Sequence, residues 1–387
     1  MTWTTPRDVR EKLRKRWSSG AYLTALASGE TWQPLPVPIR GPRAAELASR
    51  FEEVRRWVAL WENERRLRIE HKQIGARTLG ANTIPFRAWV DDRETLWALL
   101  DTADSVRTFR TLLDDTAAQS QELAAWVAAN PMKALALSDA WPSILAAVRW
   151  IDERADPGMF LRHIDAPGVD TKFIERHRGV LATLLDLQLD PRRIRDEQPR
   201  SDFEARYGFQ KKPEQIRFRL LNGSRLSGFS ELTVRAAEFI SRPEGVTTVY
   251  VIENEITYLA FPDTPGAMAV LGGGYAVNLL SSLRWLADTD LVYWGDIDTH
   301  GLAILGRLRA GFPHTESMLM DEATLLSHRT HWTLEPVQAG LPESLNPAET
   351  ALWNDLSTHR HGPSIRLEQE RIRFSAIRDH LARRSTR

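Results

Sequence analysis

The sequence predicts an α/β protein with a parallel sheet in its C-terminal part and a mainly helical N-terminal part. Two observations lead to this fold class. From about residue 230 onward, β-branched runs alternate with helical patterns and glycine-rich turns, which is the order of elements that forms a parallel sheet. Before residue 155, apolar residues recur mainly at helical spacing.

The first helix is predicted to begin at Thr5-Pro6, where a capping hydroxyl precedes a proline at the first helical position, and to run through Trp17. Four prolines between residues 34 and 42 then favour an extended connection. A second helix is expected from about Ala44, with an apolar seam that should pack against a partner helix in an intramolecular hairpin. The seam residues are Leu47, Phe51, Val54, Val58 and Trp61. Further helices are expected over residues 94–113, 120–129 and 143–153, which completes a mainly helical domain over residues 1–155.

The pattern changes after residue 155. Turn signals at residues 156–158 and 166–168 bracket this change, since each contains the dipeptide Pro-Gly. A helix with one basic flank is expected over residues 171–189, and a strand of alternating polar and apolar residues over 215–221. A helix and a strand together suit a small winged helix. The sequence therefore predicts such a module over residues 156–229 and the parallel-sheet domain over residues 230–387.

Composition limits the chemistry. The 387 residues are 42% hydrophobic and 26% charged, which is typical of a globular protein of two or three domains. No apolar run approaches the roughly 18 residues of a membrane span, and no apolar segment follows the basic N-terminus, so we expect no membrane contact and a cytoplasmic location. The absence of cysteine excludes disulfides, thiolate metal sites and cysteine nucleophiles. Carboxylates remain as the main metal ligands, and they favour Mg²⁺ or Mn²⁺.

Carboxylates stand at the ends of two predicted strands. The run 291–294 leads to Asp296 and Asp298, which share one face of an extended chain, and the run 246–252 ends on Glu253. Open α/β sheets place their chemistry at the carboxyl edge of the strands. The 43 residues from Glu253 to Asp296 leave room for a helix, a strand and another helix, so the two strands can be neighbours. We therefore expect Glu253, Asp296 and Asp298 to hold a divalent metal ion.

Each of these residues has a structural alternative. Asp298 could simply cap a helix that begins at Thr299. Four weaker site candidates are Glu255, His300, Glu368 and Glu370. Glu255 could be a solvated loop residue. His300 could contact phosphate or a metal-bound water, or it could cap a helix or pack in the core. The last two could orient a second metal ion, although pairing with Arg366 and Arg371 is the simpler expectation.

A glutamate that ends one strand and an Asp-x-Asp that ends a later one resemble the Toprim domain of topoisomerases, primases and related nucleases. Asn254 replaces the glycine that usually follows the glutamate there. Longer strings resemble the family of JetD, also called MksG, the nuclease subunit of the Wadjet anti-plasmid system, and this resemblance covers nearly the whole chain. The strings are WGDIDTHG at residues 294–301, VDTKF at 169–173 and RLEQER at 366–371.

The resemblance implies a metal-dependent DNA endonuclease in which Glu253, Asp296 and Asp298 are both catalytic residues and metal ligands. It further implies a homodimer similar to the A subunit of topoisomerase VI, in which winged-helix and Toprim-like modules grip double-stranded plasmid DNA. An SMC-type motor complex with MukBEF-like subunits would deliver that DNA. In the topoisomerase a winged-helix tyrosine attacks the backbone, whereas Tyr207, alone in the corresponding region, lacks similar neighbours. We therefore hypothesise attack by a metal-activated water.

The charge pattern gives weaker guidance on DNA contact. The 51 lysines and arginines balance the 51 acids, so no global argument for a polyanionic partner exists. Residues 172–219 carry twelve basic against eight acidic side chains, an excess that an ordinary solvated surface could also show. The candidates for phosphate contact are Lys172, Arg176, Lys211, Lys212, Arg217 and Arg219.

Other functions share part of this residue pattern with the nuclease. A phosphatase of the haloacid-dehalogenase type also places an Asp-x-Asp after a strand, but it needs a downstream lysine, and no lysine follows Lys212. A non-catalytic Toprim scaffold, a plain DNA-binding subunit and a topoisomerase VI-like strand-passing subunit remain as alternatives. Metal-dependent nicking of a plasmid distinguishes the nuclease from the scaffold and the binding subunit.

Overall fold

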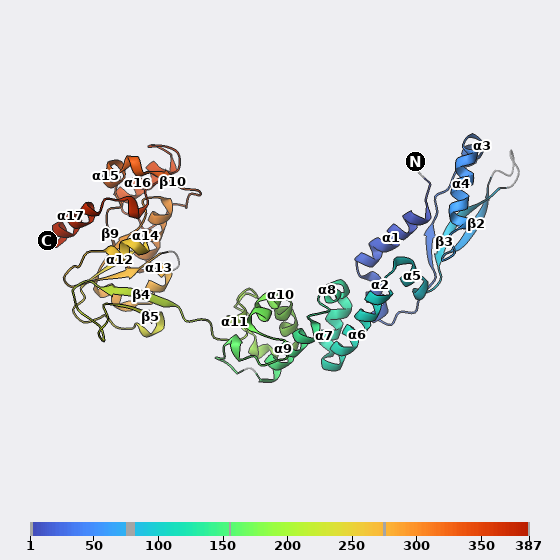
Figure 1. The fold of residues 1–387 in the computed structure, drawn as a ribbon, viewed down its shortest axis with the longest axis horizontal. Coiled ribbons are helices and arrows are strands. Elements are labelled where there is room, and N and C mark those ends of the chain that lie inside the picture. The colour runs from blue at the N-terminus through green and yellow to red at the C-terminus, as the bar shows by residue number, and fades with distance from the viewer. Residues whose placement is uncertain (1–2, 75–81, 155, 274–275, 386–387) are drawn as a thin grey trace. The chain divides into compact units, whose positions relative to one another are not determined.

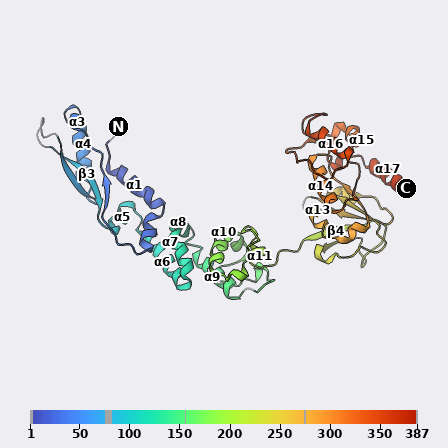
Figure 2. The same ribbon diagram turned by 180° about the vertical axis from the view of Figure 1, so that it is seen from behind.

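A computed structural model describes residues 3–74, 82–154, 156–273 and 276–385. The chain forms two compact units, which we call the N-terminal unit (Met1–Lys211) and the C-terminal unit (Lys212–Arg387). Figures 1 and 2 show the elements of each unit from two opposite sides. The N-terminal unit is mainly helical and the C-terminal unit contains a mixed sheet with four parallel strands, so the predicted α/β class is confirmed. Among the described helices, none combines the length and the hydrophobicity needed to cross a membrane.

The N-terminal unit begins as the sequence predicts. Helix α1 (Pro6–Ser18) starts at a capping box in which Thr5 and Asp8 bond each other's backbone N–H groups, and it buries Val9, Leu13 and Trp17 at intervals of four. Helix α2 (Ala21–Ala27) follows. The proline-rich segment forms β1 (Leu35–Pro38), an edge strand that pairs with β3 (Asn82–Val90), while β2 (Arg68–Ile74) pairs with the other side of β3. An edge is where a strand tolerates proline.

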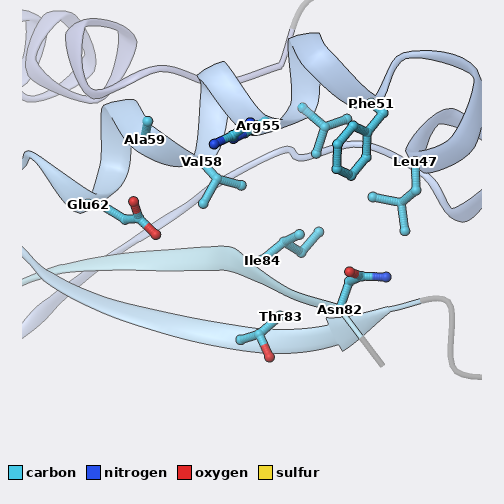
Figure 3. Close-up of a pocket in the computed structure, with 10 residues that line it drawn as sticks. Leu47, Phe51, Arg55, Val58, Ala59, Glu62, Asn82, Thr83 and Ile84 are labelled. Atoms are coloured by element: carbon cyan, nitrogen blue, oxygen red, sulfur yellow. The ribbon is translucent and has the colours of Figure 1, made fainter. Parts of the chain in front are cut away.

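The predicted seam packs on a sheet and not on a partner helix, so that prediction was wrong. The segment is split at Arg50 into α3 (Ala44–Ser49) and α4 (Phe51–Glu62), and α4 lies against β3. Figure 3 shows Leu47, Phe51 and Val58 directed toward Ile84 of that strand. An apolar seam at helical spacing specifies a flat apolar neighbour, and both a helix and a sheet provide one. The two layers line a groove of 830 Å³, and Phe51 is 61% exposed at its rim.

The remaining helices of the N-terminal unit are α5 (Arg93–Leu100), α6 (Ala103–Gln119), α7 (Gln121–Ala129), α8 (Pro131–Ala136), α9 (Trp141–Arg154), α10 (Thr171–Gln188) and α11 (Phe203–Arg206). They confirm the helices predicted over residues 94–113, 120–129, 143–153 and 171–189. The expected domain boundary near residue 155, which itself lies outside the described residues, is not observed. Helices α9 and α10 pack together, and one apolar core extends from Val9 to Phe209. The Pro-Gly turns reverse the chain within this core, because a turn signal marks a local bend and not a gap in packing.

A partly buried acid holds the end of this unit together. Asp186 on α10 accepts hydrogen bonds from Arg206 at 3.0 Å, from Arg200 at 2.7 Å and from the hydroxyl of Tyr207 at 2.7 Å. The same hydroxyl lies 2.8 Å from the carbonyl oxygen of Ala182. Tyr207 is therefore a buried structural side chain.

The C-terminal unit is built on a six-stranded sheet of order β5-β4-β7-β6-β8-β9. Its strands are β4 (Gln215–Leu220), β5 (Glu231–Arg235), β6 (Thr248–Ile252), β7 (Ala267–Leu271), β8 (Asp290–Trp294) and β9 (Glu316–Ser317). The last four are parallel, and β4 pairs antiparallel with β5 and β7. The predicted adjacency of the runs ending before Glu253 and Asp296 is confirmed, because β6 and β8 pair directly.

The strand predicted over residues 215–221 belongs to this sheet, so its assignment to a module with residues 171–189 was wrong. The alternation of β4 buries Ile216, Phe218 and Leu220 against the sheet core. Alternation reveals that one face of a strand is buried, but not which neighbour buries it. The structure accordingly divides the chain after Lys211, and the described residues 156–211 pack with the N-terminal unit and not as a separate winged helix over 156–229.

Helices and a small ribbon complete the C-terminal unit. The helices are α12 (Glu255–Ala260), α13 (Ala276–Leu280), α14 (Thr299–Gly311), α15 (Glu322–Ser327), α16 (Pro347–Ser357) and α17 (Phe374–Ser385). Strands β10 (Thr333–Leu334) and β11 (Ile365–Arg366) form an antiparallel pair. Short 3₁₀ helices are η1 (Leu161–His163) and η2 (Pro191–Arg193) in the first unit, and η3 (Ala236–Glu238), η4 (Arg284–Asp288), η5 (Arg329–His331) and η6 (Gln369–Arg371) in the second.

Candidate metal centre

The three predicted acids meet at the carboxyl edge of the parallel sheet. Ile252 of β6 lies opposite Trp294 of β8, and the N–H of Glu253 donates to the carbonyl of Trp294 at 3.2 Å. The two strands therefore end side by side. Glu253, Asp296 and Asp298 line one cavity of 220 Å³, as the spacing of the sequence predicts. The cavity is completed by His300, Glu335, Pro336, Val337 and Arg366.

Gly295 makes room for the carboxylate of Glu253. A Cβ at this position would lie 2.6 Å from Glu253 Oε2 and 2.3 Å from the hydroxyl of Tyr293, both far inside van der Waals contact. That hydroxyl donates to the same Oε2 at 3.1 Å and fixes its orientation. Asn254, in place of the usual glycine, has φ −83° and caps α12, so the turn does not require glycine.

Asp298 has both of the roles considered for it, as a helix cap and as a cavity residue. Its Oδ1 accepts from the N–H of Gly301 at 2.7 Å and caps α14, and its Oδ2 lies 3.2 Å from Arg366 Nε. A Cβ on Gly301 would lie 2.1 Å from the carbonyl oxygen of Asp296, so glycine lets the first turn of α14 approach the acidic loop. Capping thus positions the carboxylate without removing it from the cavity.

A segment near the C-terminus crosses the ends of both strands. Leu367 forms an antiparallel bridge with Ile297, with N–H to carbonyl distances of 2.9 and 3.0 Å. Gln369 is 1% exposed, and its backbone N–H donates to Asp296 Oδ1 at 2.7 Å. Its side chain donates to the carbonyl of Trp294 at 2.7 Å and accepts from the N–H of Asn254 at 2.8 Å. Gln369 thereby links the two acidic loops. The sequence analysis quoted this segment but assigned Gln369 no role.

Arg366 from the same segment supplies the positive charge of the cavity. Its guanidinium bonds Asp296 Oδ2 through Nη2 and Nε, the latter at 3.1 Å, and also lies beside Asp298. The expected partners were Glu368 and Glu370, and that expectation was wrong for Arg366. Glu368 pairs with Arg371 at 2.7 Å, as predicted, whereas Glu370 accepts from the side chain of Asn254 at 3.2 Å.

Glu335 is a fourth carboxylate that the sequence analysis missed. It follows β10, is 3% exposed, and accepts through Oε1 from Thr299 Oγ1 at 2.6 Å and from the N–H of His300 at 3.2 Å. Its Oε2 is buried without a hydrogen-bond partner among the described residues. Because a two-residue strand gives no periodic signal, nothing in the sequence distinguished Glu335 from other glutamates.

The cavity contains more carboxylates than positively charged side chains. Burial raises the pKa of Glu253, and the neighbouring charge of Asp296 raises it further. Burial likewise raises the pKa of Asp298 to about 6, against the opposing hydrogen bond from Gly301. Burial alone would lower the pKa of Arg366, but the hydrogen bond to Asp296 and the charges of the neighbouring acids together outweigh burial and raise it. Four carboxylates thus face a single guanidinium in this cavity.

This donor set fits Mg²⁺ or Mn²⁺. All the candidate ligands are carboxylate oxygens, which such hard ions prefer, and Oε2 of Glu335 is a buried acceptor that lacks a donor. The raised pKa values of Glu253 and Asp298 come first from burial and then from neighbouring carboxylates, and a divalent cation would offset both effects. Glu253, Asp296 and Asp298 would hold the ion.

Two weaker site candidates lie differently from the main acids. Glu255 is paired with Arg217 at the start of α12, so the structure gives it an ion-pair role. His300 lies at the rim of the cavity, where its Nε2 is 2.8 Å from the carbonyl oxygen of Val337.

The six basic candidates are divided between the two units. Lys172, Arg176 and Lys211 belong to the N-terminal unit, and Lys212, Arg217 and Arg219 belong to the C-terminal unit. Several already have partners within the protein. Lys211 pairs with Asp202, Arg217 pairs with Glu231 as well as Glu255, and Arg219 donates to the carbonyls of Leu259 and Phe261. Lys172, Arg176 and Lys212 are exposed and remain the better candidates for phosphate contact.

A separate group of possible metal ligands lies on α15, α16 and the loop that follows α16. Glu322, Asp355 and His361 each place a ligand atom within 4.8 Å of the others. His361 Nε2 is 3.3 Å from Glu322 Oε1, and Asp355 also pairs with Arg360 at 2.9 Å. Internal ion pairing accounts for this group.

Comparison with known families supports the resemblance that the sequence motifs carry. Residues 208–381 match the family described as Wadjet protein JetD, C-terminal. Residues 6–186 match a family described as the N-terminal part of an uncharacterized protein conserved in bacteria, DUF3322. No curated protein matches the chain. The two matches together span most of both units, and the chain belongs to the JetD family of Wadjet proteins.

Proposed function

We propose that the chain is a divalent-metal-dependent endonuclease that cuts plasmid DNA as the effector of the Wadjet system. One observation carries the proposal: Glu253, Asp296 and Asp298 converge in one cavity at the carboxyl edge of adjacent parallel strands. Membership of the JetD family supports the Wadjet role, and the proposal adds the chemistry. The resemblance to Toprim nucleases agrees with both.

The described side chains have distinct parts in this proposal. Glu253, Asp296 and Asp298 would hold Mg²⁺ or Mn²⁺, which supplies polarisation of the phosphate and a lowered pKa for an attacking water. Tyr293 orients Glu253 through its hydroxyl, and Gln369 orients Asp296 through its backbone N–H. The last two are positioning residues, because they bond the carboxylates and not the reacting atoms.

The position of Tyr207 favours water over a tyrosine as the nucleophile. Its hydroxyl is bonded to Asp186 and to Ala182, and burial raises the pKa of Tyr207, with Asp186 raising it further. A buried phenol of raised pKa is a poor nucleophile. Trapping of a covalent adduct between Tyr207 and DNA would contradict this part of the proposal.

The proposed partners follow from family membership and from the resemblance to the A subunit of topoisomerase VI. They are double-stranded plasmid DNA, an SMC-type motor complex that delivers it, and a second copy of the chain in a homodimer. Lys172, Arg176 and Lys212 are the exposed residues proposed to contact phosphate.

A non-catalytic DNA-binding subunit is the second candidate, and the contacts of Arg366 favour it. The guanidinium pairs with both Asp296 and Asp298, as in a structural ion-pair network. The excess of acids over bases in the cavity favours the nuclease, since its one guanidinium faces four carboxylates and pairs with only two of them.

The test is cleavage of supercoiled and linear plasmid by the purified chain with Mg²⁺ or Mn²⁺, compared with an Asp296→Asn/Asp298→Asn variant. The matched control is Asp263→Asn/Asp288→Asn, which removes the same charge from exposed positions of the same unit. We expect the parent and the control to cut and the site variant to be inactive. Equal cutting by the site variant would remove the proposed centre, and binding without any cutting would support the second candidate.

A further inference from the structure

We infer that the groove between α4 and β3 is a docking site for an amphipathic helix of another protein. The groove belongs to the N-terminal unit, so the inference is independent of the chemistry proposed for the C-terminal unit. Its volume is 830 Å³, and six of the ten residues that line it are apolar. Leu47, Val54 and Ile84 form its floor and are buried. Figure 3 shows side chains of the helix facing those of the strand across the groove.

One face of α4 is used by the fold of its own unit. Trp57 and Trp61 are 4% and 1% exposed, and neither lines the groove. Both indole N–H groups donate to the carbonyl of Thr4, at 2.7 and 3.2 Å. These contacts anchor α4 and leave its neighbouring face to line the groove.

The neighbouring face carries a row of side chains with the spacing of a helix-packing seam. The row consists of Phe51, Arg55, Val58 and Glu62, at steps of four, three and four residues. Such spacing directs a row of side chains toward one partner helix, whereas an extended peptide presents side chains at a period of two. Phe51 is 61% exposed, so its ring forgoes the stabilisation that burial gives an aromatic side chain. The row therefore lacks the partner helix that its spacing specifies.

The two charged members of the row define the charges of that partner. Arg55 and Glu62 are exposed, and neither forms an ion pair with another described residue. They are seven residues apart in the sequence, which is about 10.5 Å along a helix axis. The complementary helix has an acid beside Arg55 and a base beside Glu62, also two turns apart, with apolar side chains on the face that enters the groove.

A second copy of α4 fits this pattern less well than a different protein does. If two copies of α4 paired antiparallel, Arg55 of each could face Glu62 of the other. Phe51 would then face Arg66 of the other copy, which lies four residues beyond the end of the helix. The most exposed apolar side chain of the row would thus meet polar surface. A separate helix can extend its apolar face past Phe51 and cover the ring.

The length of α4 sets the size of the interface. Its twelve residues extend about 18 Å, which accommodates roughly three turns of a docked helix. An interface of this size belongs to the small, transient class, so we expect a dissociation constant on the order of 10 μM.

The experiment selects ligands for the immobilised full chain from a phage library of random peptides about 18 residues long. Counter-selection against a Phe51→Ser chain removes peptides that bind elsewhere. We expect the remaining peptides to carry apolar residues at helical spacing, with an acid and a base seven positions apart, and to become helical on binding as judged by circular dichroism.

Fluorescence anisotropy then measures the affinity of one synthesised peptide for matched variants. Phe51→Ser should weaken binding by about thirtyfold or more, because it removes the aromatic anchor. The matched control is Leu60→Ser, which removes a 49% exposed apolar side chain of the same helix outside the groove and should change the affinity by less than about twofold. Glu62→Lys should weaken binding about tenfold, and replacing the base of the peptide by glutamate should restore it.

Four outcomes overturn the inference. They are the absence of peptides that depend on Phe51, enrichment of peptides without helical spacing, equal binding by the parent and Phe51→Ser, and binding that Glu62→Lys leaves unchanged. Sedimentation of the parent beside Phe51→Ser tests the second copy, since a change of oligomeric state would assign the groove to another copy of the chain and overturn the inference as well. If Phe51→Ser does not fold, as judged by circular dichroism, Arg55→Glu makes the same comparison through charge, and unchanged affinity then overturns the inference.

Discussion

Each unit holds a partly buried acid, and the two units shift the pKa of that acid in opposite directions. In the N-terminal unit, burial of Asp186 would raise its pKa, but hydrogen bonds from Arg206, Tyr207 and Arg200 overcome that effect and lower it. In the C-terminal unit, burial raises the pKa of Glu253, and neighbouring acids add to the increase. The number of donors decides the difference. A fully paired acid stabilises the fold, whereas the underpaired group of acids is the site proposed to bind a divalent cation.

The largest effect is expected at the proposed metal centre, where the acids differ from Asp186 in lacking enough donors. Glu253→Gln should reduce metal-dependent cleavage by about 10³-fold, because a neutral amide is a poor ligand for a hard ion. Binding of the same plasmid should stay within about twofold, since the exposed basic residues are unchanged. Gel assays of cleavage and of binding on one preparation measure both, and equal losses would indicate misfolding or a wrong assignment.

The second effect is on stability. Asp186→Asn should destabilise the N-terminal unit by about 3 kcal/mol, because it leaves the buried guanidinium of Arg206 with only the exposed Asp196 as a charged partner. Hydrogen exchange of α10 and α11 measures this opening free energy for the N-terminal unit alone. The matched control is Asp196→Asn, whose 83% exposed side chain pairs with the same arginine and should contribute little. Faster exchange confined to the C-terminal unit would contradict the comparison.

A smaller effect is expected at Gly295, which makes room for the carboxylate of Glu253. Gly295→Ala should weaken Mn²⁺ binding about tenfold, since the added methyl group displaces the carboxylate and the hydroxyl of Tyr293. Gly340→Ala is the control, because a Cβ there meets no atom within 4 Å. Titration with Mn²⁺ measures the affinity of each variant. Parent-like binding by Gly295→Ala would show that Glu253 can shift without loss.

The smallest effect is a difference in pH dependence without metal. The folded-state pKa of Asp298, about 6, lies above the ordinary value of 3.8 for an aspartate, so the folded C-terminal unit binds the proton more tightly. Its stability should therefore fall as pH rises from about 4 to 6, by up to about 1.4 kcal/mol per pH unit.

The N-terminal unit should not share this slope. The pKa of Asp186 is lowered in the folded state, so above about pH 4 this side chain is ionised in both the folded and the unfolded chain. The stability that ionised Asp186 contributes is therefore already present at about pH 4 and is lost only at lower pH. Hydrogen exchange of both units at pH 4.5 and 6.5 with a chelator measures the two slopes. Asp298→Asn should flatten the slope of the C-terminal unit, and an unchanged slope would assign it to other groups.

The sequence correctly predicted the features that depend on neighbouring residues, such as the start of a helix or the position of a strand. Thr5 and Pro6 predicted the start of α1, and the β-branched run before Glu253 predicted β6. The spacing of Asp296 and Asp298 also brought the acids to one edge, because parallel strands end together. These features depend on a few neighbouring residues and on a general rule of sheets.

The features that the sequence did not predict depend on distant partners. The strand at residues 215–220 alternates as expected, yet its pairing with β7 involves residues about fifty positions later. Arg366 bonds Asp296 across 70 positions, and Gln369 bonds Asn254 across 115. Such pairings follow from tertiary packing, which no local spacing specifies.

The crossing segment has a consequence for how the site comes into being. Leu367 and Gln369 join the acidic loops only after 70 further residues have been added beyond them. A copy that stops before Arg366, through premature termination or proteolysis, still contains Glu253, Asp296 and Asp298 but lacks the contacts that orient Asp296. Completion of synthesis is thus built into assembly of the cavity, and under the proposed function an incomplete copy would lack an ordered site.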